Sequence, residues 1–402
     1  MLPIAWTRLL VTACALAGCV ANARAADSPV RATVTLVHAS DAAWRAEYRL
    51  SEPVDAIELG PPIVEYRASA WSLKSPGLSL ARDAAGESIR GGKSFDRAIV
   101  EIADYAPWAH DQYIPIDRHS DGGHAFYLGH LMGSVRQGTR ERNLLVTFEL
   151  VGLHGENVLL AEQANDDQGT YAYFGPQQAI DAGAVRLVVD PQTPRWIRDT
   201  IDAVVAPVSS FYQQAFRRSW KASPLLIIGA GRLDEPGFSI KGGALPGELF
   251  FKIAGQQAAS GDTQLRTMFE QLVAHELAHI WQGLVRRGGT GEATESWIHE
   301  GGAQALSLAA LEVSGLWNAQ AATAFKAKLH AECVQIRTAQ AAGQAADTSR
   351  EAYTCGYERF AAYPTGPVEL WRRLLAETER SGAPYSAAMV QRVSARTTSG
   401  VR

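Results

Sequence analysis

Two histidines and a glutamate stand close together in the stretch His275-Glu276-Leu277-Ala278-His279. On a helix, positions four residues apart share one face, so both imidazoles can reach the same metal ion. Glu276 lies between them on the same side of the helix, where a carboxylate can hold a water molecule without binding the ion. This spacing is the H-E-x-x-H pattern of hydrolytic metal sites. The segment therefore predicts a metal site on one helix, with a base beside it.

The flanking residues predict that this helix turns its site residues inward. At about 100° per residue, Leu265, Leu272, Glu276 and His279 point in nearly the same direction. Asp262 is placed to cap the N-terminus of the helix. Burying polar side chains without a partner is energetically costly, so these inward-facing groups need one. A metal ion would supply it.

A further carboxylate follows 21 residues after His279, in the stretch Trp297-Ile298-His299-Glu300-Gly301. Catalytic zinc takes three protein ligands and leaves one position for water. Glu300 on a second, antiparallel helix would complete such a set with the two histidines. We therefore predict one Zn²⁺ ion bound by His275, His279 and Glu300. The alternative third ligand is His299.

The pattern H-E-x-x-H followed by W-x-x-E-G is similar to the gluzincin metallopeptidases of the aminopeptidase N clan. It looks closest to the branch that contains bacterial glycyl aminopeptidases, although outside residues 270–305 the similarity is diffuse. The resemblance implies that His275, His279 and Glu300 bind zinc. It also implies that Glu276 is the general base, which takes a proton as water attacks the peptide carbonyl and passes it to the leaving amine.

Two further roles are implied by this family. Its members stabilise the oxyanion with a tyrosine about fifty to sixty residues after the ligand glutamate. Tyr353 lies 53 residues after Glu300 and is the predicted donor, with Tyr357 as the second candidate. The family's G-x-M-E-N strand edge, which holds an extended peptide and its free amine, is missing from residues 242–248. Glu248 is a candidate for binding that amine, and the other interpretation is a solvated charge at a strand end.

The zinc motif predicts an enzyme that hydrolyses peptide bonds, acting as an aminopeptidase, and the export signal that residues 1–25 resemble predicts that its substrates are exported or extracytoplasmic peptides. A second hypothesis is a zinc endopeptidase that cleaves a specific envelope protein. A third is a low-activity envelope binding or scaffold protein that retains the peptidase fold. The intact Glu276 favours the enzymes, because a site without catalytic demand does not need a base.

The elements that position the site fall into two regions. Alternating apolar and polar residues at 43–50 and 144–150 predict strands, separated by turns rich in glycine and proline. After Asp190 the pattern changes, and Thr193 is predicted to cap a helix that begins with Pro194. Further strands are expected at 224–229 and 249–254, and helices at 263–284, 297–313 and 366–380.

We therefore predict an α+β protein with two domains. Residues 26–189 are expected to form an antiparallel β domain. Residues 190–402 are expected to form a mostly helical catalytic domain, which the family resemblance implies is thermolysin-like. The other histidines, such as His124 and His130, have no third ligand at an obvious spacing and are predicted to be structural.

Residues 1–25 read as an export signal. Arg8 precedes an apolar stretch at 9–18, and the small-residue pattern Ala23-Arg24-Ala25 resembles a cleavage site. The stretch Leu16-Ala17-Gly18-Cys19 also resembles a lipobox, in which Cys19 carries lipid. The mature protein is thus expected to be periplasmic, anchored to the outer membrane as a lipoprotein, or secreted.

Cysteine content and charge agree with this location. Outside the signal only Cys333 and Cys355 remain, and two cysteines in an oxidising compartment predict one disulfide. The formal net charge is −4, which gives no electrostatic basis for binding nucleic acid. The expected partners are a peptide or protein substrate, and the membrane only through an N-terminal lipid.

Overall fold

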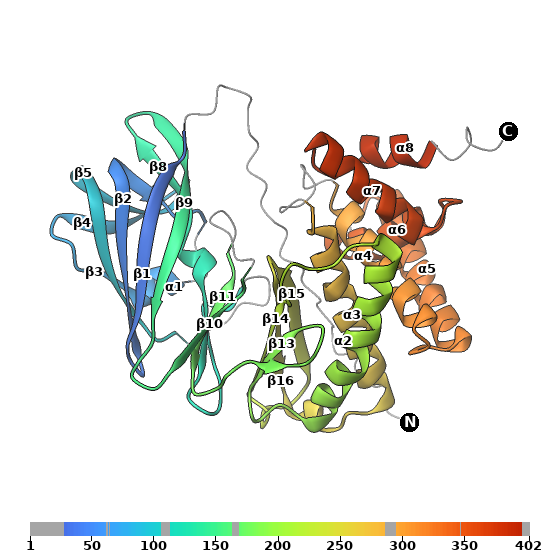
Figure 1. Ribbon diagram of the computed structural model, residues 1–402. Coiled ribbons are helices and arrows are strands. Elements are labelled where there is room, and N and C mark those ends of the chain that lie inside the picture. The colour runs from blue at the N-terminus through green and yellow to red at the C-terminus, as the bar shows by residue number, and fades with distance from the viewer. Residues whose placement is uncertain are drawn as a thin grey trace.

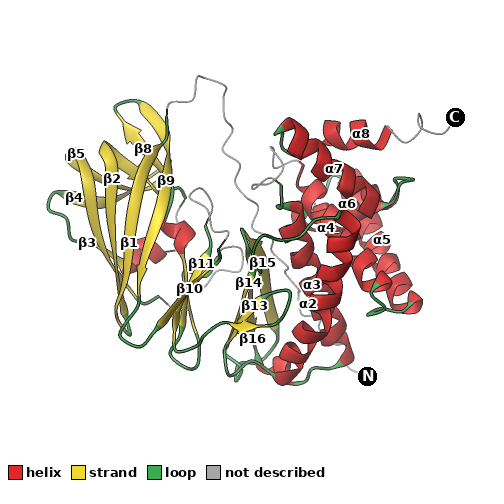
Figure 2. Cartoon of the chain, viewed as in Figure 1, coloured by secondary structure: helices red, strands yellow, loops and turns green. Residues whose placement is uncertain are grey.

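The computed structural model describes residues 28–61, 63, 65–105, 113–162, 169–285, 295–345 and 347–395. Strands fill the first half of this chain and helices fill most of the second, so the protein is α+β, as predicted. Two sheets, a third sheet and a group of helices follow one another across the molecule (Figures 1 and 2). The predicted signal, with Cys19, lies outside the described residues. Within those residues, no helix has the length and apolar character needed to span a bilayer.

The first sheet has seven strands, and β2 (Ala43–Glu58) and β5 (Gly86–Ala103) form its centre. Both β1 and β8 lie between β2 and β9, and each of them pairs with both of these strands. Most pairs are antiparallel, but β1 and β9 are parallel, which is possible because a long stretch of chain connects them. The other elements are β1 (Val30–Ser40), α1 (Tyr66–Ala70), β3 (Trp71–Leu73), β4 (Leu78–Asp83), β8 (Ser134–Gln137) and β9 (Arg140–Val151).

The second sheet has four strands in the order β10-β11-β7-β6. Aromatic side chains fill the space between it and the first sheet, and Trp44, Phe126 and Phe174 are all buried there. On the facing first sheet, buried and more exposed residues alternate along β1 and β2, as the period-two pattern of a strand requires. The following elements belong to the second sheet: β6 (Ile116–Arg118), β7 (His124–Tyr127), the 3-10 turn η1 (Leu128–Leu131), β10 (Asn157–Leu160) and β11 (Tyr171–Gly175).

The third sheet lies between the second sheet and the helices (Figure 1). Its strand order is β12-β13-β14-β16-β15, and β13 and β14 are parallel. This sheet therefore uses strands from both sides of the predicted boundary at residues 189 and 190, while the domain limits themselves stay a prediction. The strands are β12 (Ile180–Asp181), β13 (Arg186–Val189), β14 (Leu225–Gly231), β15 (Ser239–Leu245) and β16 (Glu248–Ala254).

The helices pack on the third sheet around one large apolar core. The three strong helices predicted from the sequence correspond to α3, α4 and α7. The predicted cap of α2 is wrong by one residue, because Pro194 itself occupies the capping position. The elements are α2 (Arg195–Phe216), η2 (Gln256–Ala259), α3 (Thr263–Gln282), α4 (Ser296–Val313), α5 (Ala319–Ala341), α6 (Thr348–Ala361), α7 (Pro367–Ser381) and α8 (Ala387–Ala395).

The predicted disulfide is confirmed, since Cys333 on α5 is bonded to Cys355 on α6. Closing this 22-residue separation restricts the unfolded chain. Replacing both cysteines with alanine is therefore expected to lower the free energy of unfolding by about 2–4 kcal/mol. Urea-induced unfolding of the parent and the variant measures this difference. Parent protein treated with a reductant is the control. The prediction would be contradicted if the variant and the reduced parent both unfolded at the same urea concentration as the untreated parent.

Candidate metal centre

Helix α3 carries the first half of the site. Its N-cap is Asp262, as predicted, and the side chain accepts a hydrogen bond of 2.9 Å from the backbone of Leu265. One face of the helix packs into the core. That face carries His275 and Glu276, whose side chains are only 2% and 4% exposed. The inward orientation expected from the helical period is therefore present.

Helix α4 carries the second half and runs antiparallel to α3. The side chain of Gln282 contacts the backbone of His299, whereas Gln271, earlier on α3, contacts Gln304, later on α4. The start of α4 also lies very close to α6. A Cβ atom on Gly301 would lie 2.2 Å from the backbone of Gly356, so only glycine fits beside Glu300 at this crossing.

The structure brings together the side chains of His275, His279 and Glu300. The two Nε2 atoms lie 3.0 Å apart, and a carboxylate oxygen of Glu300 lies 3.2 Å from Nε2 of His275 and 3.3 Å from Nε2 of His279. With metal–ligand distances of about 2.0–2.2 Å, the donors of a tetrahedral zinc ion lie about 3.3 Å apart. The three observed separations fit such an ion.

Electrostatics at this site favour a cation. Burial disfavours the ionised form of Glu300, but His279 and His275 outweigh it and hold the pKa of Glu300 below its usual range. For His279, burial is likewise outweighed, chiefly by Glu300, and its pKa is raised to about 9. The carboxylate thus attracts positive charge into a buried position between two imidazoles. Lone pairs of two imidazoles and one carboxylate are a donor set that zinc prefers.

One predicted ligand, His279, is oriented by a residue that the sequence analysis did not identify. Gln282 is 1% exposed, and its side-chain oxygen lies 2.7 Å from Nδ1 of His279. Its amide nitrogen donates to the backbone oxygen of His299, 3.0 Å away. Partners of this kind fix the orientation of a metal-binding imidazole. Gln282 thereby joins the end of α3 to the residue before Glu300. Its position three residues after His279, on the same face of the helix, is the sequence feature that could have identified it.

Glu276 lies next to the edge strand β15. Burial raises the pKa of its carboxyl above the usual value, while His279, His275 and a backbone hydrogen bond from Ala244 act in the opposite direction. β15 pairs with β16 and ends the order of strands in the described sheet. A buried carboxylate with a raised pKa, beside the last strand of the described sheet, is suited to accept a proton near neutral pH.

The two candidate tyrosines occupy different surroundings. The ring of Tyr353 stacks on that of His275, with centroids 5.3 Å apart. Tyr357, one turn later on α6, is 8% exposed and packs within the large helical core. The structure thus brings Tyr353 to the site and places Tyr357 in the interior. The disulfide at Cys355 holds this part of α6 against α5.

Glu248 is placed differently from the expectation for a substrate-binding group. It is 0% exposed, and its carboxylate accepts hydrogen bonds of 2.9 Å from the Thr170 hydroxyl and the Tyr171 backbone. Burial raises its pKa to about 8, with these two hydrogen bonds acting in the opposite direction. Glu248 therefore joins the second and third sheets. A carboxylate with no exposed surface is not available to a substrate amine, which argues against the predicted role.

Compared by sequence, the chain matches no family model and no curated protein. Its structure is similar to an aminopeptidase N family protein from Idiomarina loihiensis, with 12% identity and a TM-score of 0.56 over 93% of this chain and 74% of that one. Yeast LTA4 hydrolase is similar with 10% identity and a TM-score of 0.52, over 91% and 64%. An M1 zinc metallopeptidase from Deinococcus radiodurans has 12% sequence identity and a TM-score of 0.47, over 90% of this chain and 88% of that one. The chain has the α+β fold of the aminopeptidase N family.

Proposed function

We propose that this protein is a zinc-dependent peptidase that acts as an aminopeptidase on peptides outside the cytoplasm. The observation that carries the proposal is the donor set of His275, His279 and Glu300, with separations of 3.0–3.3 Å, beside the buried carboxylate of Glu276. The similarity to solved structures contributes the fold alone, so activity is inferred from these side chains.

Each group at the site has a separate role in peptide hydrolysis. Zinc bound by the two histidines and Glu300 would polarise water and the substrate carbonyl. Glu276 accepts a proton from the attacking water and returns it to the leaving amine. The hydroxyl of Tyr353, whose ring stacks on His275, donates to the oxyanion. The edge of β15, which pairs with no further strand among the described residues, binds the peptide backbone as an added strand.

Location outside the cytoplasm is part of the proposal. The bond between Cys333 and Cys355 supports it, because stable disulfides are typical of oxidising compartments. The signal pattern at residues 1–25, with Cys19 as a candidate for lipidation, supports it from the sequence. In this setting the substrates would be peptides present in the envelope or outside the cell.

An endopeptidase is the second candidate, and the position of Glu248 favours it. An aminopeptidase needs an anionic group to hold the substrate's free amine. The stretch 242–248 lacks the family's anchoring motif, and Glu248 is enclosed between Thr170 and Tyr171. If no other carboxylate supplies this contact, an extended peptide could lie across β15 with residues on both sides of the site.

A blocked substrate separates these two candidates. For an aminopeptidase, N-acetylation of an alanine tetrapeptide is expected to lower kcat/KM by about 10- to 100-fold, because a charge-assisted hydrogen bond of about 1.5–3 kcal/mol is lost. Hydrolysis followed by chromatography measures the rate and identifies the cleaved bond. The control peptide is blocked only at its C-terminus and should be cleaved normally. Equal rates with cleavage at internal bonds would establish the endopeptidase.

A further inference from the structure

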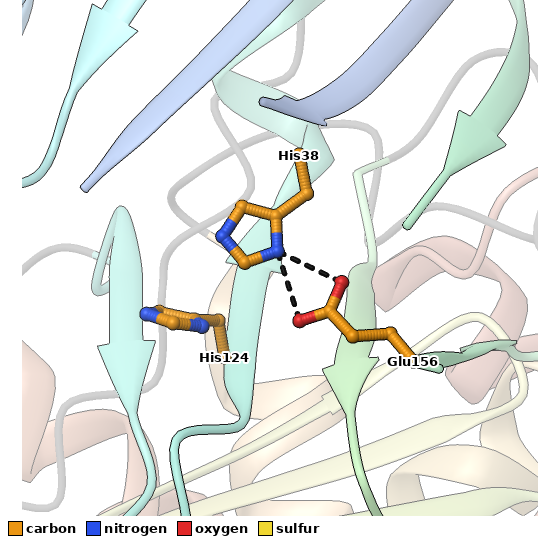
Figure 3. A group of neighbouring side chains, drawn as sticks. All are labelled: His38, His124 and Glu156. Carbon is orange, nitrogen blue, oxygen red and sulfur yellow. Dashed lines mark hydrogen bonds and ion pairs between the residues drawn. The ribbon is translucent and has the colours of Figure 1, made fainter. Parts of the chain in front are cut away.

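A second group with the same kinds of donor lies in the N-terminal part of the chain. It consists of His38, His124 and Glu156, one donor atom from each lying within 4.8 Å of the others. Figure 3 shows the three side chains approaching one another from separate segments. His38 is near the end of β1, His124 begins β7, and Glu156 precedes β10. The group thus joins the first sheet to the second.

The local backbone turns His38 towards this group. The register between β1 and β2 shifts between His38 and Ser40, as at a β-bulge, and bulges commonly redirect a side chain. The His38 ring then stacks on Trp44 with centroids 3.9 Å apart and planes 9° apart. His124 meets the same indole edge-on at 5.7 Å. Both imidazoles are therefore held in fixed orientations by an aromatic core.

The polar atoms of this group are buried and only partly satisfied. His38 is 2% exposed and His124 is 5% exposed. Nδ1 of His38 lies 2.9 and 2.8 Å from the two carboxylate oxygens of Glu156, which also accepts a bond from the backbone of Leu153. Nδ1 of His124 has no hydrogen-bond partner among the described residues. Leaving such a nitrogen buried and unpaired costs free energy, so the arrangement calls for a partner.

We propose that His38, His124 and Glu156 form a second zinc site that joins the two sheets of the N-terminal part. Two imidazoles and one carboxylate are suited to Zn²⁺, whereas an oxygen-only group would suit calcium or magnesium. The ion would use the unpaired nitrogen of His124. Glu156 has the most exposed side chain of the three, at 12%, so water can reach the remaining position from its side. Because the ligands lie up to 118 positions apart, binding favours the folded chain.

The competing explanation is a simple hydrogen-bonded pair of His38 and Glu156 without a metal ion. It explains the close contact of these two side chains but leaves Nδ1 of His124 without a hydrogen-bond partner in the described part of the chain. The observed separations of 2.8–2.9 Å fit a hydrogen bond, and they need to widen by about half an ångström for both atoms to bind one zinc ion. Metal binding by the purified protein decides between the two.

The test is the zinc content of the full chain after dialysis against Zn²⁺, measured by mass spectrometry. The parent is expected to hold about two equivalents, and Glu156→Gln and Glu300→Ala about one each. The double variant should hold none. Glu149→Gln is the matched control, because this carboxylate also lies beside β1 and accepts a bond from Thr35, but it contacts no histidine among the residues that the structure describes. It should keep both equivalents.

Two further readouts keep the outcome clear. Added Zn²⁺ should raise the melting temperature of Glu300→Ala by a few degrees and leave the double variant unchanged. Glu156→Gln should retain peptidase activity, because it lies outside the catalytic group. The proposal is overturned if Glu300→Ala holds no zinc, or if Glu156→Gln holds as much as the parent. Failure of the catalytic site alone would look different, since zinc would then be lost with Glu156→Gln and not with Glu300→Ala.

Discussion

Replacing Glu276 with glutamine is expected to lower kcat for peptide hydrolysis by about 10²- to 10⁴-fold while the fold and the zinc content stay unchanged. Glutamine has the same shape as glutamate but cannot accept the proton. Glu276 is not one of the three donors that lie together, so its loss leaves His275, His279 and Glu300 in place. An amide oxygen also preserves an acceptor for the backbone of Ala244.

The measurement is kcat on an unblocked peptide, with zinc content determined on the same samples. Glu270→Gln is the matched control. It makes the same chemical change on the same helix, at a residue whose carboxylate accepts a bond from the Trp317 indole. This variant should be fully active. A Glu276→Gln enzyme within about tenfold of the parent would rule out the general base. Loss of zinc would show that Glu276 instead supports the ligands.

Local patterns predicted most of the helical half of the molecule. The helical period placed Leu272 and Glu276 of α3 in the core, and the Asp262 cap is present as expected. These features depend on residues a few positions apart, where spacing determines direction. The predicted ligand pair, His275 and His279, likewise depends on residues only four positions apart. The prediction for Glu300 required only that the next helix run antiparallel to α3, which the short separation between His279 and Glu300 favours.

Features that depend on distant contacts could not be predicted in this way. His38, His124 and Glu156 meet only after β1, β7 and the segment before β10 have been assembled, so the sequence offered no third ligand for His124 at an obvious spacing. The burial of Glu248 depends on β11 packing beside the third sheet. The parallel pairing of β1 with β9 could not be predicted either, because the alternation of residues within one strand does not indicate which strand pairs with it.

Glu300→Ala is expected to weaken zinc binding by about 100-fold or more, because loss of a ligand should cost at least as much as loss of a group that orients one. Peptide hydrolysis should fall with it. The carboxylate lies within 3.3 Å of both imidazole nitrogens, and it supplies the negative charge that attracts a cation to this buried position. Zinc affinity by competition with a chromophoric chelator measures the effect, corrected for any ion at the second site with the Glu156→Gln background.

His299→Gln is the decisive companion variant, since His299 is the alternative third ligand. Its ring lies 6.2 Å from that of His279 and 5.6 Å from that of Tyr385, so it packs beside the site among aromatic groups. We expect this variant to keep zinc affinity within about tenfold of the parent. The reverse result, with zinc lost in His299→Gln and kept in Glu300→Ala, would make His299 the ligand. It would require α4 to turn relative to α3, which the contact from Gln282 to the backbone of His299 opposes.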